Sequence, residues 1–374
     1  MCNKIFWPNY NHSILGIPNS ILKHYGVKNE YTTLPKLDKV LAKNYKNIVL
    51  MILDGLGVDM IKHNLHPLSF LRRHIKDKIS SVFPPTTTAA TSTYYSAKPP
   101  VCHGWVAWSP YFKEYDHVIE LFRDKDLYTQ KKLNIEPVAQ QLQYEHIFKK
   151  INDANKEVCT TKIFPSFEEG GAETFQEMCD RISSQTQKSG KQFILAYWNE
   201  PDHTSHEHNP YSHQVKSAIT HINYQVKKMC NTLQDTLVII SADHGQIKID
   251  ETVYVNDYDG VVECLKVPLS LDDRVSAIFL KEGYEQKFIE LFNNYFAKDF
   301  MLIKSEKALE QNLFGEGKPH TRVKDFLGDY LIISTSYKSL RQHVEGETEA
   351  EELKGSHSGL LAKESIVPLI VIEK

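Results

Sequence analysis

Four short runs of apolar residues constrain the fold of this 374-residue chain more than any other feature of its sequence. They span residues 47–54, 192–198, 236–242 and 367–373, and each is rich in Ile, Val, Leu or Tyr. Runs of this length and composition are typical of buried parallel strands. Helical periodicity lies between them, most clearly at residues 170–187 and 211–234, and a further helix is expected at 88–96. The alternation predicts an α/β fold, a doubly wound and mostly parallel sheet with helices on both faces.

The pattern of predicted strands and helices changes after residue 246. Residues 274–281, 284–296, 299–304, 305–313 and 329–335 form a β-α-β-α-β pattern. This block separates the third apolar run from the fourth. We therefore predict a small α+β subdomain at 254–342, inserted into a core made of residues 1–253 and 343–374. The acidic run at 345–352 is interpreted as a solvated loop.

Polar residues gather where these strands end. The first three runs lead directly into carboxylates and histidines, and a Gly-Ser-His segment precedes the fourth. Because ligands of open α/β sheets bind outside the carboxyl ends of the strands, we expect these side chains to meet at one edge. Mixed Asp and His ligands suit zinc, with manganese or iron as alternatives. Two sites can be composed, one from Asp202, His206 and His357 and the other from Asp54, Asp243 and His244. Each residue alone could instead be a helix cap, a turn or an exposed loop residue.

A threonine cluster supplies a candidate nucleophile. Thr86, Thr87 and Thr88 follow a proline pair and lead into an Ala-rich stretch that favours a helix. A hydroxyl there would sit at a helix N-terminus, where backbone N–H groups favour a phosphate. A bound metal could lower the pKa of that hydroxyl. Without the metal residues, a cluster of helix caps would be the simpler interpretation.

Together these motifs resemble the type I phosphodiesterase and nucleotide pyrophosphatase branch of the alkaline phosphatase superfamily, from about residue 47 to the C-terminus. The matching features are Asp54 after the first strand, a threonine sixteen residues before His103-Gly104, the E-P-D-x-x-x-H motif at 200–206, D-H-G at 243–245 and G-S-H at 355–357. The resemblance implies an alkaline phosphatase-like core, supports both metal sites, and chooses Thr87 as nucleophile and additional ligand. It implies a phosphothreonine intermediate, with the two ions about 4 Å apart.

One position departs from the family pattern. Many nucleotide pyrophosphatases have an Asn five residues after the His of His-Gly, where it helps to hold a phosphate oxygen, whereas this chain has Trp108. Asn199 is a candidate replacement. Trp105 and Trp108 belong to an aromatic segment that could stack a nucleobase or simply pack in a core, and the sequence leaves both open.

The function expected from these features is hydrolysis of phosphate diesters or nucleotide pyrophosphates, with a small phosphate ester or nucleotide as substrate. A phosphomonoesterase or phosphonate hydrolase is the alternative. The absence of Arg and Lys from the nucleophile segment before Lys98 favours diesters. A C/S-x-P-x-R motif is missing, which disfavours a sulfatase. An enzyme of the cofactor-independent phosphoglycerate mutase type is disfavoured because those use a serine and are larger. A non-catalytic metal-binding protein is a minor alternative.

Charge and cysteine usage limit the partners. With 44 Lys and Arg against 47 Asp and Glu, the net charge of −3 gives no support for a nucleic acid polymer or a polybasic membrane anchor. The six cysteines include no C-x-x-C pair and are interpreted as reduced core thiols. The start of the sequence lacks a signal-peptide pattern, so we expect a cytoplasmic enzyme. The oligomeric state is not indicated.

Overall fold

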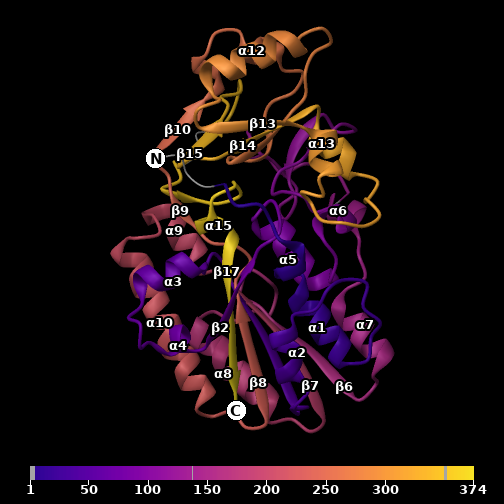
Figure 1. Cartoon of the computed structure of the whole chain (residues 1–374), viewed down its shortest axis with the longest axis vertical. Coiled ribbons are helices and arrows are strands. Elements are labelled where there is room, and N and C mark those ends of the chain that lie inside the picture. Colours follow the sequence, from indigo (N-terminus) through magenta and orange to yellow (C-terminus); the bar gives the residue numbers. More distant parts are fainter. Residues whose placement is uncertain (1–4, 137, 349–351) are drawn as a thin grey trace.

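The computed structural model describes residues 5–136, 138–348 and 352–374. A six-stranded sheet in the order β2-β17-β8-β1-β7-β6 forms the lower half of the molecule (Figure 1). Its strands are β1 (Asn47–Leu53), β2 (Ile75–Ser80), β6 (Val158–Ile163), β7 (Lys191–Trp198), β8 (Thr236–Ser241) and β17 (Ile366–Glu373). The strands β6, β7, β1 and β8 are parallel. This confirms the predicted mostly parallel sheet.

The fourth apolar run, β17, corrects one expectation, because it pairs antiparallel with β8. Its N-terminal end therefore lies at the edge where β1, β7 and β8 finish. The physical reason is that His357 precedes β17, whereas the other polar groups follow their strands. Because the chain passes the site at His357 before it enters the sheet, β17 must start at the site and run away from the site, opposite to β8. β2 joins the other side of β17, also antiparallel.

Helices cover both faces of this sheet, as predicted (Figure 1). One group packs around α10 (His213–Cys230) and the other around α1 (Gly16–His24). The first group also contains α3 (Val58–Asn64), α4 (Phe70–Arg73), α8 (Phe175–Thr186) and α9 (Asp202–His208). The second also contains α2 (Pro35–Leu41), α5 (Thr87–Ser96) and α7 (Ile147–Ala154). The predicted helices at 88–96, 170–187 and 211–234 correspond to α5, α8 and α10.

A second, antiparallel sheet lies at the opposite end of the molecule (Figure 1). It consists of β11 (Ser270–Asp272), β12 (Val275–Ile278), β14 (Tyr330–Ser334) and β13 (Phe300–Lys304), with α12 (Glu285–Tyr295), α13 (Ser305–Glu310) and α14 (Val323–Leu327) beside it. The predicted β-α-β-α-β block is present, and β11 adds a strand that the sequence did not indicate. We call this four-stranded unit the inserted sheet. β10 (Glu251–Tyr254) and β15 (Lys338–Arg341) pair in parallel where the chain enters and leaves it.

Shorter elements complete the described chain. The short helix η1 (Tyr10–His12) precedes α1, and α6 (Pro100–His103) follows α5. A small three-stranded sheet comes next in the chain and consists of β3 (Tyr111–Phe112), β4 (His117–Glu120) and β5 (Lys125–Asp126). The short helix η2 (Val138–Leu142) follows it. β9 (Ile247–Lys248) pairs with β16 (Gly355–Ser356), and η3 (Val255–Asp257), α11 (Val261–Cys264) and α15 (Ala362–Ser365) are the remaining helices.

Two clusters of buried apolar residues hold the parts of the chain that meet at the site. The larger one surrounds the central sheet. The second joins residues of the segment 83–142, such as Trp105 and Phe112, to residues of the inserted sheet, such as Val275 and Leu331. The inserted sheet therefore shares a core with an earlier part of the chain. The boundaries at 254 and 342 stay a prediction.

Three smaller expectations concern the surface. Residues 345–348 and 352 lie outside helices and strands, whereas 349–351 lie outside the described residues. Five described cysteines are unpaired; Cys179, Cys230 and Cys264 are buried, whereas Cys159, in the edge strand β6, is exposed. No helix among the described residues is long and apolar enough to cross a lipid bilayer.

Candidate metal centre

Three aspartates meet at the carboxyl edge of the central sheet. Asp54 follows β1, Asp243 follows β8, and Asp202 begins α9 just after β7. Since β1 lies between β7 and β8, the three turns are neighbours. The backbone holds them together, because the Asp54 N–H donates to Trp198 O at 2.9 Å and the Asp202 N–H donates to Asp54 O at 3.1 Å.

Two glycines allow these turns to approach so closely. Gly55 has φ +70°, and a Cβ there would lie 3.0 Å from Asp202 Cα. A Cβ on Gly57 would lie 2.6 Å from Gly245 Cα, the residue after His244. Side chains at these positions would push apart the strand ends that carry the aspartates.

Three histidines complete the cluster, and all three are oriented in the same way. The Nδ1 atoms of His206, His244 and His357 lie 2.8–2.9 Å from the carbonyl oxygens of Gly355, Gly245 and Pro85. If Nδ1 donates in each case, Nε2 is left with a lone pair. The Nε2 atoms point toward carboxylates, with His244 3.3 Å from Asp54 Oδ1, His206 3.2 Å from Asp202 Oδ2, and His357 3.8 Å from Asp202 Oδ1.

These donors fit divalent metal ions. The ligand atoms of Asp54, Asp243 and His244 all lie within 4.8 Å of one another, and so do those of Asp202, His244 and His357. His244 thus belongs to both groups, and its ring stacks on that of His357 at 3.6 Å between centroids. His206 reaches the second group through Asp202. The six residues chosen from the sequence therefore come together. Asp54 Oδ1 and Asp243 Oδ2 are buried without a hydrogen-bond partner, as expected for atoms that a cation would satisfy.

The pKa values of two of these carboxyl groups, Asp54 and Asp202, are strongly shifted, and in opposite directions. Burial raises the pKa of Asp54 well above its usual value, and the charges of Asp243 and Asp202 raise it further. Burial alone would also raise the pKa of Asp202, but the three histidines outweigh it and lower that pKa. Such opposed shifts are typical of functional sites.

The pKa values of the three histidines are also shifted in opposite directions. Burial alone would lower the pKa of His206, but Asp202 raises it to about 9. Burial alone would lower the pKa of His244 as well, but Asp243 and Asp54 raise it to about 10. Burial and the charge of His244 hold the pKa of His357 well below its usual value.

Thr87 occupies the first position of α5 and is 9% exposed. Its Oγ1 lies 3.2 Å from His244 Nε2 and 3.4 Å from Asp54 Oδ2. Neighbouring Thr86 is the N-cap, its side chain makes no capping hydrogen bond, and the first N–H groups of α5 have no partner inside the helix. A hydroxyl, three carboxylates and three imidazoles thus converge at a helix N-terminus.

The sequence from residue 48 to 267, more than half of the chain, matches the model of the type I phosphodiesterase / nucleotide pyrophosphatase family. The chain belongs to this family. It is a metal-dependent phosphoric ester hydrolase of the nucleotide pyrophosphatase/phosphodiesterase kind, in a family of two-metal-ion enzymes. No curated protein matches the sequence.

Solved structures with the same fold include two kinds of hydrolase. Murine ectonucleotide pyrophosphatase/phosphodiesterase 5 is 16% identical, with a TM-score of 0.62 over 86% of this chain and 87% of its own. An inactive threonine-to-alanine variant of that protein was solved in complex with AMP, with a TM-score of 0.63. Phosphonoacetate hydrolase from Sinorhizobium meliloti, in complex with phosphonoformate, is 16% identical, with a TM-score of 0.59 over 86% of this chain and 89% of its own.

The three substrate-contact candidates of this family member lie in different surroundings. Trp105 is buried in the second apolar cluster and donates its Nε1–H to Leu142 O at 2.8 Å, which favours packing over base stacking. Trp108 is half-buried beside Phe122, which is 51% exposed. Asn199 lies in the half-buried turn between β7 and α9. Their role in substrate binding stays a prediction.

Sequence reasoning missed three polar residues that contact the site. Tyr197 donates its hydroxyl to Asp54 Oδ2, and Gln246 donates to Asp202 Oδ1. The carboxyl of Asp272, from the inserted sheet, lies 3.4 Å from Thr86 Oγ1 and 3.4 Å from the N–H of Trp108. Burial and Asp273 raise its pKa to about 7. The hydroxyl in an otherwise apolar strand was a usable signal for Tyr197, whereas no local pattern pointed to Asp272.

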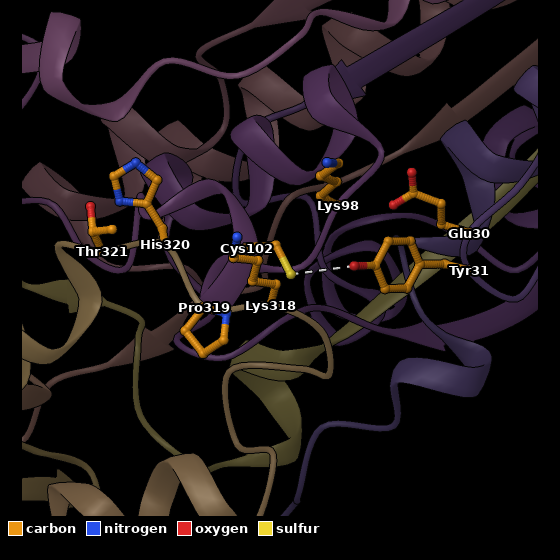
Figure 2. A pocket seen from close by; sticks show the side chains of 8 residues that line it. All are labelled: Glu30, Tyr31, Lys98, Cys102, Lys318, Pro319, His320 and Thr321. Atoms are coloured by element: carbon orange, nitrogen blue, oxygen red, sulfur yellow. Dashed lines mark hydrogen bonds between the residues drawn. The ribbon is translucent and has the colours of Figure 1, made fainter.

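A separate cavity of about 350 Å³ lies beyond the opposite end of α5. Figure 2 shows Lys98, Cys102 and Lys318 around it, with the Tyr31 hydroxyl 3.3 Å from Cys102 Sγ. Its lining includes none of the six metal-ligand candidates. A ten-residue helix spans about 15 Å, so this cavity is distinct from the metal centre.

Proposed function

We propose that the protein hydrolyses phosphate diesters or nucleotide pyrophosphates through a phosphothreonine intermediate on Thr87. The contact of Thr87 Oγ1 with both His244 and Asp54 carries this proposal, because it puts a hydroxyl nucleophile within the metal-ligand cluster.

Two divalent ions, zinc in our proposal, would be held by this cluster. Asp54, Asp243, His244 and Thr87 would hold one, and Asp202, His206 and His357 the other. When bound, such ions make a hydroxyl more acidic and stabilise the negative charge that develops during phosphoryl transfer. The orphaned buried oxygens of Asp54 and Asp243 support the first site.

The residues of the chain then divide the reaction into two displacements. The Thr87 oxygen attacks phosphorus as the bond to the leaving-group oxygen breaks, which gives the phosphothreonine ester and an alcohol or phosphate product. Water next attacks the same phosphorus and the bond to Thr87 breaks, which releases a phosphate monoester and returns a proton to the Thr87 oxygen. The free N–H groups at the start of α5 donate to the non-bridging oxygens in both steps.

A singly charged phosphoryl group suits this site best. Lys98 is the first cation after the nucleophile segment, and it lines the cavity at the other end of α5 instead of the site. The second negative charge of a monoester would need such a cation. A phosphonate hydrolase is the second candidate, favoured by the shared fold with phosphonoacetate hydrolase and by Trp108 in place of an Asn.

Three substrates on zinc-loaded protein separate the candidates. The p-nitrophenyl ester of thymidine 5′-monophosphate represents diesters, p-nitrophenyl phosphate represents monoesters, and phosphonoacetate represents phosphonates. We expect turnover of the diester to exceed that of the other two, and EDTA to abolish it. Faster turnover of phosphonoacetate would replace the diesterase proposal with the phosphonate hydrolase. Metal binding without turnover of any of the three would support a non-catalytic role.

The Thr87→Ala variant tests the nucleophile. Its zinc content and thermal unfolding should match wild type, while turnover of the preferred substrate falls by roughly three orders of magnitude or more. Thr87→Ser is the matched control, because it keeps a hydroxyl and should retain measurable turnover. Activity of Thr87→Ala near the wild-type level, with zinc confirmed, would exclude the phosphothreonine intermediate.

A further inference from the structure

A fully buried ion pair joins the inserted sheet to the segment that carries His357. Arg274 lies in the turn between β11 and β12, and Glu364 lies in α15. Arg274 Nε donates to Glu364 Oε2 and Nη2 donates to Oε1, both at 2.9 Å, and neither side chain is exposed. The two parallel bonds fix the relative orientation of the groups as well as their distance.

Further hydrogen bonds tie this pair to two backbone segments. The guanidinium also donates to Lys338 O at 2.7 Å and Ser336 O at 2.9 Å. The carboxylate also accepts from the N–H groups of Gly359 at 3.0 Å and Leu361 at 2.8 Å. The pair thus connects the strand that leaves the inserted sheet to the turn just after His357.

The residues on both sides of His357 are held from the inserted sheet. On one side, Ser356 Oγ donates to Asp273 Oδ1 at 2.9 Å. On the other side, a Cβ on Gly359 would lie 2.8 Å from Arg274 Nη2 and 2.8 Å from a carboxylate oxygen of Glu364, so the backbone lies directly against the pair. Consecutive residues of one turn, Asp273 and Arg274, therefore bracket the histidine.

Stability alone is a poor explanation for this arrangement. Taking two charges out of water costs free energy that their attraction often only offsets, and apolar replacements of similar volume are often neutral or stabilising. What apolar side chains could not reproduce is the set of directed bonds to Gly359 and Leu361. The distinctive contribution of the pair is therefore geometric.

We propose that the Arg274–Glu364 pair positions His357 and thereby sets the metal affinity of the site formed by Asp202, His206 and His357. The pair acts through the backbone of Gly359 and makes that affinity depend on the inserted sheet. This inference rests on the metal sites of the proposed function.

The test compares zinc binding in matched variants. Arg274→Met/Glu364→Leu removes both charges and keeps apolar volume, so that no charge is left buried alone. Arg274→Lys keeps the positive charge but loses the two-pronged bond. Arg322→Met is the control for arginine loss, because Arg322 belongs to the same part of the chain and pairs with a different carboxylate, donating from Nη2 to both oxygens of Glu114. His357→Ala defines the loss of a ligand.

Zinc affinity and stoichiometry are measured by competition with a chromophoric chelator, and the visible spectrum of the cobalt-substituted protein reports the ligand geometry. We expect the double variant to melt cooperatively and to bind one zinc as wild type does. It should bind the second about 10–100-fold more weakly, with a changed cobalt spectrum. Arg274→Lys should weaken the same site, and Arg322→Met should match wild type in affinity and spectrum.

The outcomes distinguish this inference from the proposed function. If His357→Ala loses one zinc but the double variant and Arg274→Lys keep the wild-type affinity and spectrum, the positioning role is overturned and the metal sites stand. If His357→Ala itself binds two zinc ions as tightly as wild type, the metal assignment fails, and the inference fails with it. Should the double variant not fold, Arg274→Lys decides, and an unchanged second site there overturns the proposal.

Discussion

Single residues outside the proposed ligand set hold the candidate ligands in place. The Tyr197 hydroxyl donates to one oxygen of Asp54 and leaves the other without a hydrogen-bond partner. The Nδ1 atom of each histidine lies on a backbone carbonyl oxygen, so that Nε2 faces the cluster. Such partners fix the orientation of ligands before a metal arrives.

Tyr197→Phe should therefore weaken metal binding without breaking the fold. The substitution removes one buried hydrogen bond to a carboxylate, which is worth about 1.5–3 kcal/mol, and zinc affinity at the Asp54 site should fall about 10–100-fold. Competition with a chelator measures the affinity. Tyr128→Phe is the matched control, because that hydroxyl donates to the carbonyl of Leu269 instead of a ligand. Equal effects of the two substitutions would contradict the role of Tyr197.

Metal binding should release protons from His206 and His244, because neighbouring carboxylates favour the protonated form of both at pH 7. Their pKa values are raised to about 9 and about 10, and each must lose its proton to offer Nε2 to a metal. His357 releases none, since its pKa is lowered. Zinc affinity at each site should thus rise about tenfold per pH unit between pH 7 and 9. Calorimetry in buffers of different ionisation enthalpy counts the protons, and no release at pH 7 would show that both histidines are neutral.

The grouping of the candidate ligands was predictable from sequence because each lies beside an apolar strand whose end fixes its place. Asp54, Asp243 and His357 are of this kind. The hydroxyl of Tyr197 was a usable signal for the residue, but the contacts that Tyr197 and Asp272 make were not predictable, for two different reasons. The side-chain direction of Tyr197 depends on the register between β7 and β1, and Asp272 reaches Thr86 only through the packing of a distant sheet.

At the scale of elements, the direction of β17 illustrates the same limit. Its apolar run resembles those of β1 and β8, so composition alone assigned it to the parallel set. The position of His357 before the strand carried the missing information, because a ligand at the N-terminal end of a strand requires that end to lie at the site. Strand existence thus follows from composition, whereas direction follows from where the functional residue stands.

The approach of the turns after β1 and β8 gives a prediction at this scale. Gly57→Ala would put a Cβ 2.6 Å from Gly245 Cα, so the turn after His244 must move. We expect a loss of about 1–3 kcal/mol in the free energy of unfolding and weaker zinc binding at the His244 site. Chemical denaturation and chelator competition measure the two effects.

Gly190→Ala is the control for this substitution. Gly190 has φ +75°, and a Cβ there would make only an ordinary contact, 3.8 Å from Glu157 O, so the change costs about 1–2 kcal/mol of backbone strain only. Its zinc affinity should equal that of wild type. If Gly57→Ala also binds zinc normally, the contact between the two turns does not place His244.

At the scale of the whole molecule, the inserted sheet supplies part of the core. Trp105, Val106 and Phe112 are buried against Val275, Leu331 and their neighbours, and these two groups come from opposite sides of the central strand β8 in the sequence. The sequence pattern indicated an insertion but could not show this, because periodicity reveals which face of an element is apolar and not what covers it.

Excision of residues 255–342 tests whether the insertion is an independent unit. The cut ends lie together, since the rings of Tyr254 and His343 stack at 4.1 Å between centroids, so a short Gly-Ser linker can close the chain. Glu364→Leu is included to avoid a lone buried charge. We expect the shortened chain to expose the apolar surface of the segment 83–142, to bind a hydrophobic dye and to lose cooperative melting. A full-length Glu364→Leu/Arg274→Met protein with the same linker inserted after Tyr254 controls for the linker and the substitutions. If the shortened chain is instead a monomer that melts cooperatively, the apolar surface of the segment 83–142 does not need to be covered by the inserted sheet.

The inserted sheet would then be a separate domain whose contribution to the site is limited to the contacts of Asp272, Asp273 and Arg274.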